Sequence, residues 1–197
     1  IGQSYQVVLC SFVMIQCGGA AEISLHLHSV VDSKNEVHDP NIAGKWSFLG
    51  HDAGVEIQES SKYEHKVIVS FAVESQGDKR TATKQYLGRR CRLNDREYME
   101  LVSDDPVDIS KLDSLNPLAI SGMLLLSLEI RKDRMEVRLI DPEKLSKAVL
   151  KSRPKLDVLK RGYQLVVTAQ SSVYQEFILQ EHEALFQERK ILLERSR

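Results

Sequence analysis

The chain has 197 residues, which fits one domain that can bury a core without a metal or disulfide staple. Apolar residues make up 42% and charged residues 28%, as in ordinary globular proteins. The net charge of -1 and the aromatic content of 6% argue against a nucleic-acid-binding protein, which needs a positive surface or stacking rings.

Residues 1–20 are predicted to be a targeting segment. Residues 7–15 form an apolar run that is as long as the core of a signal peptide and too short to span a bilayer. Because the chain opens on Ile1 and has no basic segment before this run, we expect the start of the signal to lie upstream.

Cys17 follows the apolar run directly, with Gly18 and Gly19 behind it. This arrangement resembles the lipobox of bacterial lipoproteins, which implies a lipid anchor at Cys17 and a place in the cell envelope, facing the periplasm or the cell exterior. The sequence departs from that motif at Gln16, where the lipobox has a small residue. Two alternatives stay open: cleavage after Ala20, which gives a secreted protein, and burial of the run as a strand.

Residues 21–40 are polar and have no clear periodicity, so we predict a tether or an extended lead-in strand. His26 and His28 can share one face of a strand, but no third or fourth metal ligand is evident near them. The three cysteines include no Cys-x-x-Cys pair, and the chain has no glycine-rich phosphate loop. We therefore expect neither a metal site nor a cofactor.

Residues 41–186 are predicted to fold as one mainly β domain. Alternation is clearest where Val67, Val69 and Phe71 face one way along a single strand. Because most of the strands are joined as hairpins, we predict about eight antiparallel strands that close into a barrel and so remove its exposed edges. Such a barrel is filled by side chains or holds one small ligand. The expected strands are residues 44–49, 54–58, 63–74, 80–87, 97–102, 123–131, 135–140 and 162–168.

A helix is expected before the last of these strands. Asp141 can cap free amide groups, and Pro142 suits the first helical position. Leu145 and Val149 then form an apolar stripe, and the helix should end before Pro154.

A second helix is expected after the last strand. Ser172 and Gln175 have the spacing of a capping box, in which the glutamine reaches back to the first residue. We predict that residues 187–197 extend this helix into solvent as a charged C-terminal extension. The core-facing stripe is formed by Val173, Phe177, Ile178 and Leu185.

Residues 41–46 read Asn-Ile-Ala-Gly-Lys-Trp and are similar to the Asn-x-x-x-Gly-x-Trp opening of the lipocalin and calycin barrels. The resemblance implies that Gly44 lies in the first barrel strand and that Trp46 plugs one end of the barrel. We expect Trp46 to be structural, with a place in the wall of a ligand site as the alternative.

A wider resemblance, to a family of uncharacterised bacterial lipoproteins, covers most of residues 28–186. It implies an envelope location and a lipocalin-like barrel, and it supplies no substrate. The chain departs from that family at Gln16 and across residues 116–122, where the family has a histidine. The resemblance is carried by Asp39-Pro40, the Gly-x-Trp, and residues 139–145, 165–169 and 175–186.

No arrangement of residues predicts catalysis. Ser121 precedes a glycine but lacks the second glycine of a nucleophile elbow. Asp104 and Asp105 lack the further oxygen ligands of a calcium loop. Cys91 is expected in or near a turn between two strands as a small side chain, with a reactive thiol as the alternative. We therefore predict a non-catalytic protein.

A basic cluster lies between Asp78 and Arg96, with seven basic residues against two acidic ones. Within it, Arg89, Arg90 and Arg92 are candidates to bind an anionic surface such as lipid headgroups. The alternative is a solvated hairpin whose charges prevent edge-to-edge aggregation.

These features lead to two functional hypotheses. The first is an envelope-anchored protein that binds a small apolar or amphipathic ligand in its barrel. The alternative is a filled barrel that binds a protein partner at the envelope. Neither hypothesis includes a nucleic-acid partner.

Overall fold

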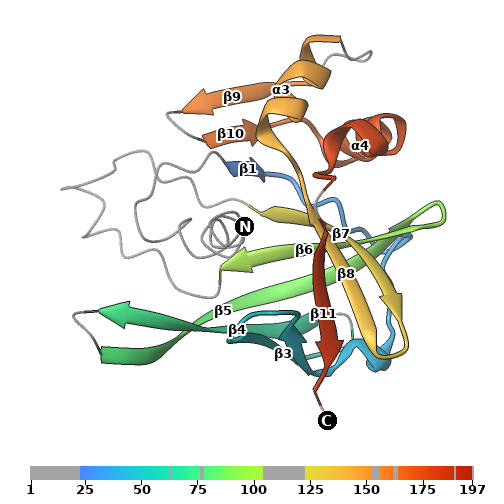
Figure 1. Cartoon of the computed structure of the whole chain (residues 1–197). Helices are drawn as coiled ribbons and strands as arrows, with labels where there is room; N and C mark the ends of the chain where they lie inside the picture. The colour runs from blue at the N-terminus through green and yellow to red at the C-terminus, as the bar shows by residue number, and fades with distance from the viewer. Residues whose placement is uncertain are drawn as a thin grey trace, which may run out of the picture.

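Eight strands close into an antiparallel barrel, in the order β11-β2-β3-β4-β5-β6-β7-β8 (Figure 1). In the computed structural model the described residues are 23–62, 64–75, 78–103, 123–151, 156–161, 164–188 and 190–196. The mainly β class and the barrel of about eight strands are thus confirmed. The strands are β2 (Gly44–Phe48), β3 (Ala53–Glu59), β4 (Glu64–Ser75), β5 (Asp78–Leu93), β6 (Arg96–Ser103), β7 (Leu124–Arg131), β8 (Arg134–Leu139) and β11 (Ile191–Arg195).

Period-two alternation explains why these segments form a barrel. In β4, Val67, Val69 and Phe71 are buried, while the residues between them are partly exposed. Met135 and Val137 point inward from β8 in the same way. Successive inward side chains fill one apolar interior, so the alternation in the sequence marks the inner face of the barrel.

The expected eighth strand belongs to a different sheet. Residues 162–168 contain β10 (Gln164–Val167), which pairs antiparallel with β9 (Val158–Arg161) and parallel with β1 (Ile23–His26). This three-stranded sheet lies beside the barrel together with both helices (Figure 1).

The barrel closes through β11, where the sequence predicts a charged helical extension, and that prediction is wrong. Ile191 and Leu193 stand opposite Val137 and Met135 of β8, and Leu193 also stands opposite Phe48 of β2. These apolar side chains complete the inner wall. Sheet closure therefore outweighs the helical tendency of a polar segment.

Helix α3 (Pro142–Lys151) begins as predicted. Oδ1 of Asp141 accepts hydrogen bonds from the amides of Glu143 and Lys144, at 3.0 and 3.1 Å. Leu145 and Val149 are buried on its inner face.

Helix α4 (Ser171–Leu185) begins without the expected capping box. No side chain caps its first turn, and the residue at the cap position is Gln170. The side-chain Nε2 of Gln175 instead donates a hydrogen bond to the carbonyl oxygen of Val30 at 2.7 Å. The predicted stripe is buried at Phe177, Ile178 and Leu185, so the helix is positioned by its apolar face.

Of the two predictions for residues 21–40, the extended lead-in strand is present as β1, and residues 26–40 pack on the barrel instead of forming a solvated tether. Val30 and Val31 are buried, and Glu36 forms a β-bridge with Cys91 of β5. A short 3-10 helix, η1 (Pro40–Ile42), then leads into β2. Two cores result, one inside the barrel and one between its outer face and the helices with their sheet.

Candidate functional site

Trp46 lies near one end of the barrel, at the third position of β2. It is buried, and its Nε1 donates to the carbonyl oxygen of Ile42 at 2.9 Å. Arg195, directly opposite on β11, holds its guanidinium 4.4 Å from the centre of the Trp46 ring. The same guanidinium donates to the carbonyl oxygens of Asn41 and Ala43. The first and last barrel strands along the chain, β2 and β11, are therefore joined by side-chain contacts at this end of the barrel.

Gly44 is required beneath these contacts. Its φ is +131°, a conformation that residues with a side chain rarely adopt. An added Cβ would also lie 2.9 Å from Nη1 of Arg195. The Gly-x-Trp of the sequence thus serves the stacking of Arg195 on Trp46.

His65 and Arg90 lie on the inner face near the same end of the barrel and are both buried. Among the described residues, neither ring nitrogen of His65 has a hydrogen-bond partner, and Nε of Arg90 has none. Burial and then the positive charge of Arg90 hold the pKa of His65 below its usual range. The imidazole is therefore neutral at pH 7, beside a cation that is paired with Glu97.

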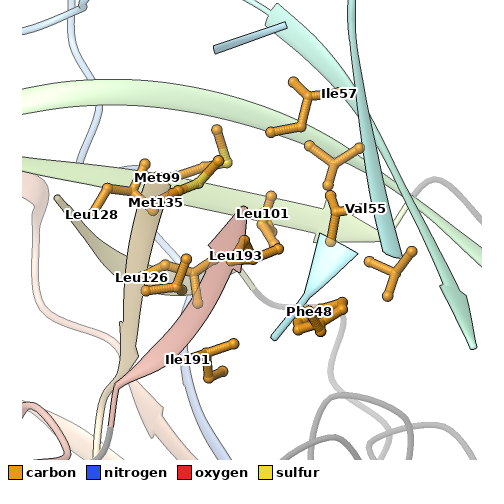
Figure 2. A pocket seen from close by; sticks show the side chains of 13 residues that line it. Phe48, Val55, Ile57, Met99, Leu101, Leu126, Leu128, Met135, Ile191 and Leu193 are labelled. Carbon is orange, nitrogen blue, oxygen red and sulfur yellow. The ribbon is translucent and has the colours of Figure 1, made fainter. Parts of the chain in front are cut away.

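An apolar cavity of about 60 Å³ lies inside the barrel (Figure 2). Met99 and Met135 lie side by side in its wall, while Phe48 and Ile191 lie toward the end of the barrel away from Trp46. Phe48 and Ile191 are only half-buried, so this end is the less enclosed one. The lining residues are Phe48, Val55, Ile57, Val67, Val69, Met99, Leu101, Leu126, Leu128, Met135, Val137, Ile191 and Leu193.

A buried carboxylate holds the lead-in segment on the outside of the barrel. Oε1 of Glu100 accepts from Nε2 of His26 at 2.7 Å and from the amide of Val30 at 2.6 Å. Its Oε2 accepts from the hydroxyl of Ser29 at 2.5 Å. The carboxylate thus joins the side chains of His26 and Ser29 and the amide of Val30, and it holds the lead-in segment against β6.

The pKa of Glu100 is set by two opposing effects. Burial by itself raises it, but the hydrogen bonds from His26, Ser29 and Val30 outweigh burial and hold the pKa below its usual range. The carboxylate is therefore charged at neutral pH.

A second buried polar pair joins α4 to β6. The hydroxyl of Tyr98 lies 2.8 Å from Nδ1 of His182, and both residues are buried. Burial, followed by the positive charges of Arg96 and Arg138, lowers the pKa of His182 to about 4. The imidazole is thus neutral at pH 7 and pairs with the phenol as an uncharged group.

This pair predicts a loss of stability in acid. His182 titrates near 6.5 when unfolded and near 4 when folded, so between these values the unfolded chain binds more protons. The contribution of His182 to the free energy of unfolding is complete above pH 6.5. It falls by up to about 3 kcal/mol as the pH decreases toward 4. Urea denaturation between pH 7.5 and 4.5 should show this slope, and His182→Gln should flatten it.

The exposed His28 supplies the matched control. His28→Gln should change the free energy of unfolding at pH 7 by no more than about 0.5 kcal/mol, because the side chain is exposed. An unchanged slope in His182→Gln would contradict the assignment of the acid sensitivity to this pair.

The three candidate arginines each have an acidic partner. Arg89 pairs with Glu36, and Arg90 and Arg92 both pair with Glu97. These partners reduce the positive charge that the cluster offers to a membrane, and binding to an anionic surface stays a prediction.

Of the remaining candidate residues, the structure describes Cys91 only. Cys91 lies within β5 and not in a turn, and the turn falls at Asn94, whose φ is +53°. Burial raises the pKa of the Cys91 thiol to about 12, so the thiol is protonated at neutral pH and a poor nucleophile. Cys17, Asp104, Asp105 and Ser121 lie outside the described residues.

Among the described residues, no group of three His, Cys, Asp or Glu side chains could hold a metal ion, and no helix is long and apolar enough to cross a membrane. Comparisons of the chain with protein-family models, with curated proteins and with solved structures found no match.

Proposed function

We propose that the barrel binds a narrow apolar chain, such as the alkyl part of an amphipathic lipid. The observation that supports this is a cavity with an uninterrupted apolar wall in a barrel that has Trp46 buried near one end. Apolar walls favour apolar occupants, because burial of both surfaces removes them from water. The less enclosed end, at Phe48 and Ile191, is the side where a chain would enter.

The size of the cavity restricts the ligand. A volume of about 60 Å³ is smaller than the roughly 150 Å³ that admits benzene in an apolar core. A single alkyl chain fits such a space better than a ring system. Met99 and Met135 are flexible side chains that can move aside and lengthen the space.

The place of action is proposed to be the cell envelope. This rests on the apolar run at residues 7–15 and on Cys17 as the residue that carries the lipid. Cells grown with a labelled fatty acid should label the wild-type protein and not Cys17→Ala. Equal labelling of the two proteins would contradict the proposal that Cys17 carries the lipid.

The second candidate is a filled barrel that binds a protein partner. The small cavity favours it, because ligand pockets commonly measure roughly 300–1,000 Å³. The two candidates differ in one measurable property, which is whether anything occupies the interior.

Native mass spectrometry of the full chain, purified without detergent, distinguishes them. We expect the purified protein to carry a reproducible bound mass. After that bound molecule has been extracted, we expect the protein to take up one molecule of added dodecanoate. Leu101→Phe places a ring in the cavity wall and should weaken dodecanoate binding at least about tenfold. A bare protein that takes up no dodecanoate would contradict ligand binding, and cross-linking for partners would follow.

Leu150→Phe is the matched control, since Leu150 is exposed on α3. It should bind dodecanoate as the wild type does. If Leu101→Phe proves unstable, the smaller change Val69→Leu tests the same wall.

A further inference from the structure

A polar groove lies on the outside of the barrel and reaches the barrel end at Arg195, with His182 of α4 in its wall. Tyr98 stands opposite Ser127, and Ser127 stands opposite Arg138, so the three form one row across β6, β7 and β8. His182 of α4 covers this row through its contact with Tyr98. Ser127, Arg138 and His182 line a hollow of about 910 Å³, together with Arg96. The groove and the apolar cavity share Leu128, but the groove is lined mainly by polar side chains and the cavity by apolar ones.

Arg138 is a half-buried cation in the wall of this groove, and its charge contributes, after those of Arg131 and Lys190, to the lowered pKa of Glu129. Its guanidinium forms no ion pair or side-chain hydrogen bond with the described residues, whereas Arg134 on the same strand lies 3.0 Å from Glu194. A guanidinium carries five donors, and holding it partly out of water without acceptors costs free energy. Arg138 is therefore ready to bind an anion from solution.

Arg96 adds a second cation to the groove. Its Nη2 donates to Glu183 at 2.7 Å, but the Glu183 side chain is 73% exposed. Such surface pairs are worth little and exchange readily for a better acceptor.

His182 and Ser127 supply neutral donors beside these cations. Nδ1 of His182 is engaged by the hydroxyl of Tyr98. A neutral imidazole that accepts at Nδ1 carries its proton on Nε2, where it can donate to a ligand. Ser127 adds a hydroxyl on the neighbouring strand, next to Arg138.

The groove is lined by four carboxylates, those of Asp39, Asp95, Glu97 and Glu129, against five cations. Glu129 is held by Arg131, and Glu97 is held by Arg90 and Arg92. These two carboxylates are thus partly neutralised, Asp39 lies 3.8 Å from Arg90, and Asp95 is exposed to solvent. The imbalance favours a negatively charged ligand over a cation.

We propose that this groove binds a phosphate-type oxyanion. Arg138 and Arg96 would donate from their guanidinium groups, and His182 and Ser127 would complete the set around a tetrahedral anion. The same chemistry is presented by a soluble phosphate monoester and by a phospholipid headgroup, and the two sources can be separated by experiment.

The first test is NMR titration of the full chain with inorganic phosphate, at constant ionic strength maintained with sodium chloride. We expect saturable shifts of the His182 ring and of the amides of β7 and β8. Arg138→Met keeps the apolar stem of the side chain and should weaken binding at least about tenfold. Arg134→Met, on the same strand but outside the groove, should bind phosphate as the wild type does.

The second test adds glycerol 3-phosphate, and separately vesicles containing phosphatidic acid, as competitors. Competition by the vesicles assigns the groove to lipid headgroups, and competition by glycerol 3-phosphate alone assigns it to soluble phosphate esters. The proposal is overturned if no saturable shift occurs, or if Arg138→Met binds phosphate as tightly as the wild type.

Discussion

Replacing Glu100 by alanine is expected to lower the free energy of unfolding by about 3–5 kcal/mol. The side chain is 2% exposed and accepts from three donors, which belong to His26, Ser29 and Val30. Its removal would leave the ring of His26 and the amide of Val30 buried without an acceptor, and each such loss carries a desolvation penalty. Urea denaturation at pH 7 measures the change.

The substitution should also release the lead-in segment. Hydrogen exchange at the amide of Val30 should rise well beyond the change expected from global destabilisation, because Glu100 is its direct acceptor. Glu129→Ala is the matched control, since Glu129 lies on the neighbouring strand and is half exposed. It should change stability by no more than about 0.5 kcal/mol.

A further property of Glu100 is its response to acid. Because the pKa of Glu100 is lower in the folded protein than its ordinary value of 4.5, its stabilising effect is present above pH 4.5 and is lost as the pH falls through the folded pKa. Glu100→Gln should remove this dependence while keeping the shape of the side chain. If Glu100→Ala were as stable as the wild type, the N-terminal segment would have to be held by its apolar contacts alone.

The inner wall of the barrel could be predicted from the sequence because its signal is local. Val67, Val69 and Phe71 alternate with polar residues, and each such run marks its own strand. The signal fails in β11, where Leu192 and Leu193 are adjacent and charged residues flank them. Alternation there is too short to distinguish a strand from a polar helix, so the closing strand was missed.

The polar groups on the outer face could not be predicted, because their partners are distant in the sequence. Glu100 is 74 residues from His26 and 70 residues from Val30. In the sequence it is one more charged residue on the outer side of a strand, which is typical of a solvated face. Only the packing of the lead-in segment and α4 over that face turns Glu100 and Tyr98 into buried partners.

Trp46→Ala is the second substitution with a large expected effect, a loss of about 3–5 kcal/mol. The ring is almost fully buried, and its Nε1 donates a hydrogen bond to the carbonyl oxygen of Ile42. Alanine would leave a cavity and remove the surface on which the Arg195 guanidinium stacks. Trp46→Phe keeps an aromatic surface and should lose only part of this free energy.

A double-mutant cycle with Arg195→Met separates the stacking from the filling of space. We expect Trp46 and Arg195 to be coupled by about 0.5–2 kcal/mol, since the guanidinium lies over the ring and is only partly exposed. Phe48→Ala, at the less enclosed end, should cost less than Trp46→Ala. Equal losses at the two positions would mean that Trp46 acts as one core residue among many. A larger loss at Trp46, together with measurable coupling, would establish that β2 and β11 are joined through this contact.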